Sequence, residues 1–155
     1  MKLNKYILYV VGMLLLFPVM NAAEPLINSK DTHLQTLVID SKPAIYLMDS
    51  SMRVHGTHPV VLNVDAASVK MLSEVEEAFG SVELIRFKLK SAKDETAKID
   101  LTQLNAFTNL KYLLVLYEYE ACGDGDACLA DKVNATITMP ENSDVEVYYL
   151  LSVPK

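Results

Sequence analysis

The segment LKYLLVLYEYEA, residues 110–121, limits the possible folds of this chain more than any other part of its sequence. Leu113, Val115, Tyr117 and Tyr119 occupy every second position, and this period places side chains on one face of a β-strand. The first half of the segment is apolar at almost every position, which is typical of a strand that is buried on both faces. We therefore expect a core strand here, covered on both sides.

Two further segments in the C-terminal third also alternate between apolar and polar residues. Residues 133–139 and residues 145–153 both follow this period of two. Residues 121–128 and 140–144 are rich in Gly, Pro, Asn, Ser and Asp, which are typical of turns. The C-terminal third therefore predicts a three-stranded antiparallel meander.

A helix between two strands is predicted in the middle of the chain. Residues 60–64 form a short apolar segment, and Asp65 follows where its carboxylate can accept the free amide hydrogens of a helix. Residues 66–79 carry apolar side chains on one face, as an amphipathic helix does, and residues 82–90 alternate as a strand. This strand-helix-strand unit, followed by the meander, predicts an α+β fold with a mixed sheet.

The remaining segments are shorter and give simpler predictions. Residues 36–40 and 44–48 read as two short strands separated by a turn. Residues 49–58 are expected to form a polar connection. The segment SAKDETAK, residues 91–98, lacks an apolar anchor and predicts a mobile charged loop.

Residues 1–23 have the layout of a secretory signal peptide. Lys2 and Lys5 precede an uncharged apolar run over residues 7–20, and small residues follow. The run is shorter than the roughly 20 residues that a membrane-spanning helix needs. We expect cleavage to leave residues 24–155 as a single small domain, periplasmic or secreted, without stable membrane insertion.

The charge balance excludes one class of partner. The chain has 14 Lys and Arg against 20 Asp and Glu, a net charge of −6. Two of those lysines belong to the predicted signal peptide, so the remaining domain has a net charge near −8. Because nucleic acids are bound by basic surfaces, we expect no nucleic-acid partner; the expected partner is a protein or a glycan.

Cys122 and Cys128 predict a disulfide-closed turn. Exported chains pass through oxidising surroundings, and the five intervening residues include two glycines, which permit a tight reversal. Closing so short a loop stabilises the fold by about 2 to 2.5 kcal/mol. The spacing does not match a thioredoxin-like pair, and structural zinc needs more ligands. Asp124 and Asp126 leave a calcium or other cation site as an alternative, although the loop departs from the EF-hand pattern.

Two parts of the chain are similar to each other at a spacing of 28 residues. FGSVELIRFKLK, residues 79–90, aligns with FTNLKYLLVLYE, residues 107–118. The run LTQLNAFTNLKYLLV resembles one unit of a leucine-rich repeat, in which a helical turn leads into a strand through an Asn-Leu step. The resemblance covers about residues 72–118, two units at most, whereas an array needs several units to bury its core. It therefore implies no binding face.

His55 and His58, in the sequence HGTH, are candidate metal ligands, but Pro59 after them favours an ordinary exposed loop that leads into a strand, and we assign no metal. They can share an ion if the backbone turns suitably, with His33 or Asp65 completing the site. The sequence contains no G-x-S-x-G, nucleotide-binding or P-loop motif. We therefore assign no catalytic residue and expect no cofactor.

Tyr148 and Leu150 face away from the main apolar side of the last predicted strand. If exposed, they form a patch of the kind that marks a partner surface; the alternative is a second core face covered by a helix. Glu118 and Glu120 offer paired carboxylates, as a glycosidase does, although acids at a strand end are commonly solubilising. We expect a non-catalytic binding or interaction module; the alternative is a metal-binding protein or metal-dependent hydrolase of the cell envelope.

Overall fold

The fold is described by a computed structural model over residues 22–74, 77–123 and 126–153, so most of the predicted signal peptide lies outside the described residues. The strands are β1 (Glu24–Pro25), β2 (Ala44–Met48), β3 (Ser51–His55), β4 (Val61–Asp65), β5 (Leu84–Leu89), β6 (Ile99–Asp100), β7 (Tyr112–Tyr117), β8 (Ile137–Thr138) and β9 (Glu146–Leu151). The α-helices are α2 (Thr32–Ile39) and α3 (Asp126–Thr136), and the 3-10 helices are η1 (Leu26–Asn28), η2 (Ala66–Ser73), η3 (Glu77–Ser81), η4 (Ala92–Thr96) and η5 (Leu101–Gln103).

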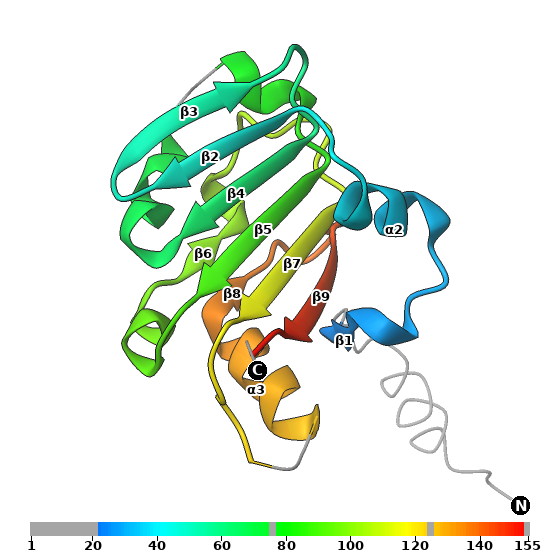
Figure 1. The fold of residues 1–155 in the computed structure, drawn as a ribbon, viewed down its shortest axis with the longest axis vertical. Helices are drawn as coiled ribbons and strands as arrows, with labels where there is room; N and C mark the ends of the chain where they lie inside the picture. The colour runs from blue at the N-terminus through cyan, green and yellow to red at the C-terminus, as the bar shows by residue number, and fades with distance from the viewer. Residues whose placement is uncertain (1–21, 75–76, 124–125, 154–155) are drawn as a thin grey trace, which may run out of the picture.

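Seven of these strands form one mixed sheet in the order β1-β9-β7-β5-β4-β2-β3 (Figure 1). Neighbouring strands are parallel throughout, except that β3 runs antiparallel to β2 at one edge. β6 and β8 form a separate parallel pair. The predicted α+β class with a mixed sheet is confirmed.

The five central strands follow the order of the chain and keep a common register. Ala44 lies opposite Val61, which lies opposite Leu84. Leu84 lies opposite Tyr112, which lies opposite Glu146. The offsets are 17, 23, 28 and 34 residues, so each crossover is longer than the one before it. The offset of 28 is the spacing of the internal similarity, whereas the leucine-rich-repeat resemblance itself stays a prediction.

The main hydrophobic core lies on the face of the sheet that the crossovers cover. Phe79 and Phe107, from two successive crossovers, stack with ring centroids 4.7 Å apart. The four central strands from β2 to β7 each contribute a side chain with no exposed surface: Ile45, Leu62, Ile85 and Leu113. These four side chains lie on one face of the sheet, as the period of two in a β-strand requires.

The predicted antiparallel meander is wrong. Helix α3 takes up residues 133–136 of the predicted middle strand, which leaves only β8 as a strand there, and β9 runs parallel to β7. Leu129 and Val133, four residues apart, are both buried in the main core. The segment therefore presents an apolar helical face as well as a period-two pattern, because positions i and i+4 lie on one side of a helix. The segments at β7 and β9 were correctly predicted as strands, but not their relative direction.

The segment predicted as a strand at residues 36–40 lies largely in α2. Asp31 caps this helix by accepting hydrogen bonds from the backbone N–H groups of His33 (2.8 Å) and Leu34 (3.1 Å). Leu34 and Leu37 are buried against the face of the sheet opposite the main core. We call this surface the α2 face; α2 lies near the ends of β7 and β9 at which these strands begin (Figure 1).

Two polar connections are more ordered than predicted, and one predicted helix takes a different form. The expected polar connection over residues 49–58 includes the edge strand β3, and the expected amphipathic helix after β4 is replaced by η2 and η3. The expected mobile loop contains η4. There Glu95 accepts hydrogen bonds from the Lys132 ammonium (2.8 Å) and the Tyr119 hydroxyl, so a charged anchor replaces the missing apolar one.

A tight hairpin joins β2 to β3. Asp49 and Ser50 both have positive φ, 52° and 57°, as a two-residue type I′ turn requires. The Asp65 carboxylate accepts from the Asp49 N–H (3.1 Å), and the Ser68 hydroxyl accepts from the Ser50 N–H (3.0 Å). Asp65 also accepts from the Ser68 N–H, which confirms the predicted helix cap, here of a 3-10 helix. Burial raises the pKa of Asp65, but hydrogen bonds from Ser68 and Asp49 outweigh it and the pKa is lowered.

Candidate functional site

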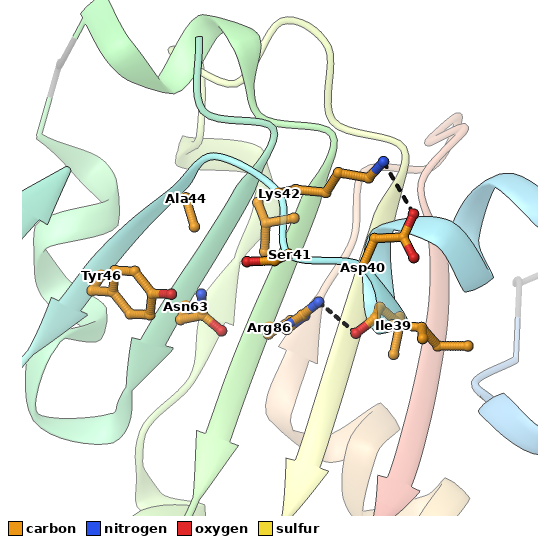
Figure 2. Close-up of a pocket in the computed structure, with 10 residues that line it drawn as sticks. Ile39, Asp40, Ser41, Lys42, Ala44, Tyr46, Asn63 and Arg86 are labelled. Atoms are coloured by element: carbon orange, nitrogen blue, oxygen red, sulfur yellow. Dashed lines mark hydrogen bonds and ion pairs between the residues drawn. The ribbon is translucent and has the colours of Figure 1, made fainter. Parts of the chain in front are cut away.

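A pocket of about 300 Å³ opens on the α2 face, between the C-terminal end of α2 and strands β2, β4 and β5 (Figure 2). We call it the α2 pocket. Its lining combines apolar, neutral polar and charged side chains from these elements: Val38, Ile39, Asp40, Ser41, Lys42, Ala44, Tyr46, Val61, Asn63 and Arg86.

The polar floor of the pocket is a row across three neighbouring strands. Tyr46 lies opposite Asn63, and Asn63 lies opposite Arg86. Residues opposite one another in register point to the same face of a sheet, and neighbouring strands are about 4.8 Å apart. Register therefore places a phenol, an amide and a guanidinium side by side. Figure 2 shows these three side chains on the strands beneath the segment that joins α2 to β2.

Arg86 is held in place by the end of α2. Its Nη2 donates to the backbone oxygens of Leu37 (2.5 Å) and Val38 (2.9 Å), which belong to the last turn of the helix. Its Nε is buried and has no hydrogen-bond partner among the described residues. Burial lowers the pKa of Arg86, and the nearby Tyr46 opposes this effect; a guanidinium nevertheless stays charged at neutral pH.

Asn63 is the second unusual group in the pocket. It is only 4% exposed, although an amide is costly to bury without partners. Its side chain makes no hydrogen bond with another residue in the described ranges, but its amide atoms, unlike Arg86 Nε, are not fully buried and so keep access to solvent in the pocket. Its neighbour Tyr46 is 40% exposed at the mouth of the pocket. The α2 pocket thus contains hydrogen-bonding groups that the fold itself leaves unused.

The rim of the pocket carries one ion pair. Lys42 Nζ lies 3.3 Å from Asp40 Oδ2, on the segment between α2 and β2. With Arg86 as the third charged lining residue, the lining has a formal charge of +1. This local charge contrasts with the net −6 of the whole chain and favours an anionic ligand over a cationic one.

The sequence offered a signal for this pocket that our predictions did not use. Asn63 and Asp65 interrupt the apolar strand segment at residues 60–65, and Arg86 is one of the charged residues that alternate with apolar ones at 82–90. Polar residues within otherwise apolar strands are either paired or functional. Nothing in the sequence, however, indicates that Asn63 and Arg86 lie side by side.

The predicted metal candidates are not brought together. His55 ends β3 and His58 follows in the next bend; both are exposed. His33 instead forms a hydrogen bond through Nε2 with the Glu83 carboxylate (2.8 Å). The Asp65 carboxylate accepts a hydrogen bond from the β2–β3 hairpin. No group of three or more His, Cys, Asp and Glu side chains is positioned to hold a metal ion within the described part of the chain.

The Cys122–Cys128 disulfide is formed. It joins the loop after β7 to the first turn of α3, so it closes a loop-to-helix junction rather than a hairpin between two strands. Asp124 and the side chain of Asp126 lie outside the described residues. The cation alternative at these two acids therefore stays a prediction.

The expected exposed strip at Tyr148 and Leu150 is not present. Tyr148 is 7% exposed and packs in the cluster beneath α2, and Leu150 packs partly buried against the same cluster. The Tyr148 hydroxyl donates to Glu146 (2.5 Å). The strand has a second buried face because α2 covers it, which is the other alternative that the sequence offered, and a partner-binding role for these residues loses the exposure on which it depended.

A second hollow of about 400 Å³ lies between η2 and η5 on the crossover side. Two of its three charged lining residues already have partners: Lys98 donates to the Ala135 oxygen (2.6 Å), and Asp100 accepts from Thr102 and Gln103. Compared with the α2 pocket, this hollow therefore has less unused hydrogen-bonding capacity.

Comparisons with protein families, with curated proteins and with solved structures find no match to this chain. Within the described ranges, none of the helices is long and apolar enough to span a bilayer.

Proposed function

We propose that this protein is an exported, non-catalytic binding module that holds a ligand in the α2 pocket. The observation that carries the proposal is the buried Nε of Arg86, which has no hydrogen-bond partner among the described residues and lies beside the Asn63 amide in the pocket lining. An unsatisfied buried polar group costs about 1 to 3 kcal/mol, and such groups call for an explanation. A ligand that bonds to both groups supplies one.

The composition of the pocket favours binding over catalysis. None of its lining residues is His or Cys, and its one carboxylate, Asp40, is paired with Lys42. Nucleophilic catalysis needs a nucleophile within hydrogen-bond reach of a base. The Ser41 hydroxyl has no such base among the lining residues. The volume suits a small molecule, or one end group of a protein or glycan partner.

Ligand-observed NMR with a chemically mixed fragment library tests the proposal. Compounds that bind in the pocket are expected to lose their signal in Asn63→Leu, which removes the amide at similar side-chain volume. Arg53→Gln is the matched control, because Arg53 lies in the same row, opposite Tyr46, but on the exposed edge strand. Hits that are indifferent to Asn63, or conversion of a hit into product, would refute a non-catalytic pocket of this kind.

Export is the second part of the proposal. The disulfide supports it, because disulfides persist mainly in oxidising compartments. Mass spectrometry of protein recovered from its native compartment should show a new N-terminus at or near residue 24. Recovery of material that retains residues 1–23, or that has two alkylatable thiols, contradicts export.

A further inference from the structure

We propose that the group recognised in the α2 pocket is a carboxylate, bound by Arg86 and Asn63 together, with an apolar portion against Ala44 and Val61. This inference rests on the proposed binding function and deepens it. The two polar residues lie opposite one another on β4 and β5, on the same face of the sheet. The two oxygens of one planar carboxylate can therefore meet the guanidinium and the amide at once.

The state of Arg86 favours an anion. The carbonyls of Leu37 and Val38 hold one terminal nitrogen and fix the orientation of the guanidinium. Nε remains as a buried donor without a partner among the described residues. A donor that is charged, fixed and already desolvated binds an anion with little reorganisation. A neutral amide or alcohol gains less from the same donor, because hydrogen bonds between ionised groups are stronger.

The helix argues against a doubly charged ligand such as a phosphate. α2 directs its C-terminus toward the pocket, and this end of a helix carries partial negative charge. Asp40 adds a negative group at the rim, which Lys42 only balances. Phosphate sites are typically built from helix N-termini or several cations. One guanidinium in this setting matches a single carboxylate.

The apolar lining indicates what the carboxylate is attached to. Val38, Ala44 and Val61 line the pocket beside the polar row, and the last two are 3% and 2% exposed. A volume of about 300 Å³ holds a carboxylate together with a short aliphatic or aromatic portion. We therefore infer an amphipathic monocarboxylate.

The test uses three probes that differ in one group: benzoate, benzamide and benzylamine. Each is titrated into ¹⁵N-labelled protein while the side-chain resonances of Asn63 (Nδ2) and Arg86 (Nε) are followed. Benzoate is expected to shift both in a saturable way, with an affinity at least tenfold higher than that of benzamide. Benzylamine is expected to shift neither. The benzoate affinity should fall with added salt, because a charge pair is screened.

Two variants assign the effect to the pocket. Asn63→Leu and Arg86→Met are each expected to weaken benzoate at least tenfold, and Arg53→Gln to leave it within about twofold. The amide spectrum of each variant reports whether it is folded. Since Arg86 also bonds to α2, Asn63→Leu decides the question if Arg86→Met loses its folded spectrum.

The outcomes separate this inference from the proposed function. Benzamide or benzylamine binding in the pocket as tightly as benzoate overturns the carboxylate but keeps a binding module. The absence of pocket shifts with every probe and every library compound overturns both. A benzoate affinity unchanged in Asn63→Leu also overturns the inference.

A carboxylate can come from several sources, and three further probes distinguish them. N-acetyl-leucine represents the C-terminus of a peptide, glucuronate an acidic sugar, and 4-methylpentanoate a free aliphatic acid. Tightest binding of either apolar acid supports an amphipathic carboxylate and identifies its source. Tightest binding of glucuronate contradicts the apolar portion of the inference.

Discussion

The hydrogen bond between Asp31 and Tyr112 offers a sharp test of how α2 is fixed to the sheet. Asp31 caps α2 through the N–H groups of His33 and Leu34 and also accepts a hydrogen bond of 2.6 Å from the Tyr112 hydroxyl. One carboxylate therefore both starts the helix and ties it to β7. We predict that Asp31→Ala loses both contributions and loosens the wall of the α2 pocket.

The magnitude follows from the two roles. Loss of a helix cap costs about 1 kcal/mol. Loss of the acceptor leaves the hydroxyl of Tyr112, a residue 6% exposed, without its partner, which costs about 1 to 2 kcal/mol. We therefore expect Asp31→Ala to lower the free energy of unfolding by about 2 to 3 kcal/mol. In a double-mutant cycle with Tyr112→Phe, the coupling should be about 1 kcal/mol.

The effect also has a defined pH dependence. The hydrogen bond from Tyr112 is the largest cause that lowers the pKa of Asp31 below its ordinary 3.8. A carboxyl whose pKa is lowered by folding stabilises the fold fully above its unfolded pKa, and this contribution is lost as the pH falls through the folded pKa. The difference between the wild type and Asp31→Asn is thus expected to be constant between pH 5 and 7 and to shrink below about pH 3.8.

Urea denaturation followed by circular dichroism measures these quantities at pH 7 and at a series of acidic values. The matched control is Asp144→Ala, because Asp144 is an exposed acid in the connection before β9; it should change the free energy of unfolding by less than about 0.5 kcal/mol. A coupling below about 0.3 kcal/mol, or an Asp31→Asn deficit that persists unchanged at pH 2, would show that the carboxylate does not link α2 to the sheet.

Three further substitutions test other parts of the fold by urea denaturation. Replacing Cys122 and Cys128 together with Ser should cost about 2 kcal/mol, because the unfolded chain gains loop entropy; an unchanged midpoint contradicts this. Gly56→Ala should cost at least about 1 kcal/mol, since φ is +80° and a Cβ would lie 2.9 Å from a proline Cβ, whereas Gly123→Ala, with nothing within 4 Å, should be near neutral. Phe79→Ala should cost about 3 to 5 kcal/mol, because this stacked ring is 1% exposed; a loss below 1 kcal/mol would contradict its place in the core.

The core strands were predictable because burial imposes a pattern on each of them separately. β5 and β7 alternate or run apolar over their full length, and their pairing offset of 28 residues is visible as an internal similarity. The direction of β9 was not predictable in this way. Strand direction depends on the structure of the connection, and residues 133–139 alternate as a strand although residues 133–136 continue the helix that begins at 126. Burial of Leu129 and Val133 against the core decides for the helix.

The candidate site was harder to predict than the strands. Asn63 and Arg86 are 23 positions apart and become neighbours only through the register of β4 and β5. The end of α2, which fixes Arg86, lies in a segment that the sequence suggested was a strand. The sequence left two alternatives for Tyr148, exposure or a second core face under a helix, and the position of α2 decides for the second. The pocket thus depends on tertiary arrangement. The sequence alone shows only that polar residues occur within the strands that form it.

The pairing of β1 with β9 has a consequence for the order in which the chain acquires its structure. Glu24 and Pro25 lie opposite Tyr148 and Tyr149, so the earliest strand in the sequence docks on the latest. During synthesis, this segment finds no strand to pair with until the final strand has emerged. This edge of the sheet therefore forms last. In a nascent chain, the segment at Glu24 and Pro25 stays unpaired and open to other interactions until synthesis is nearly complete.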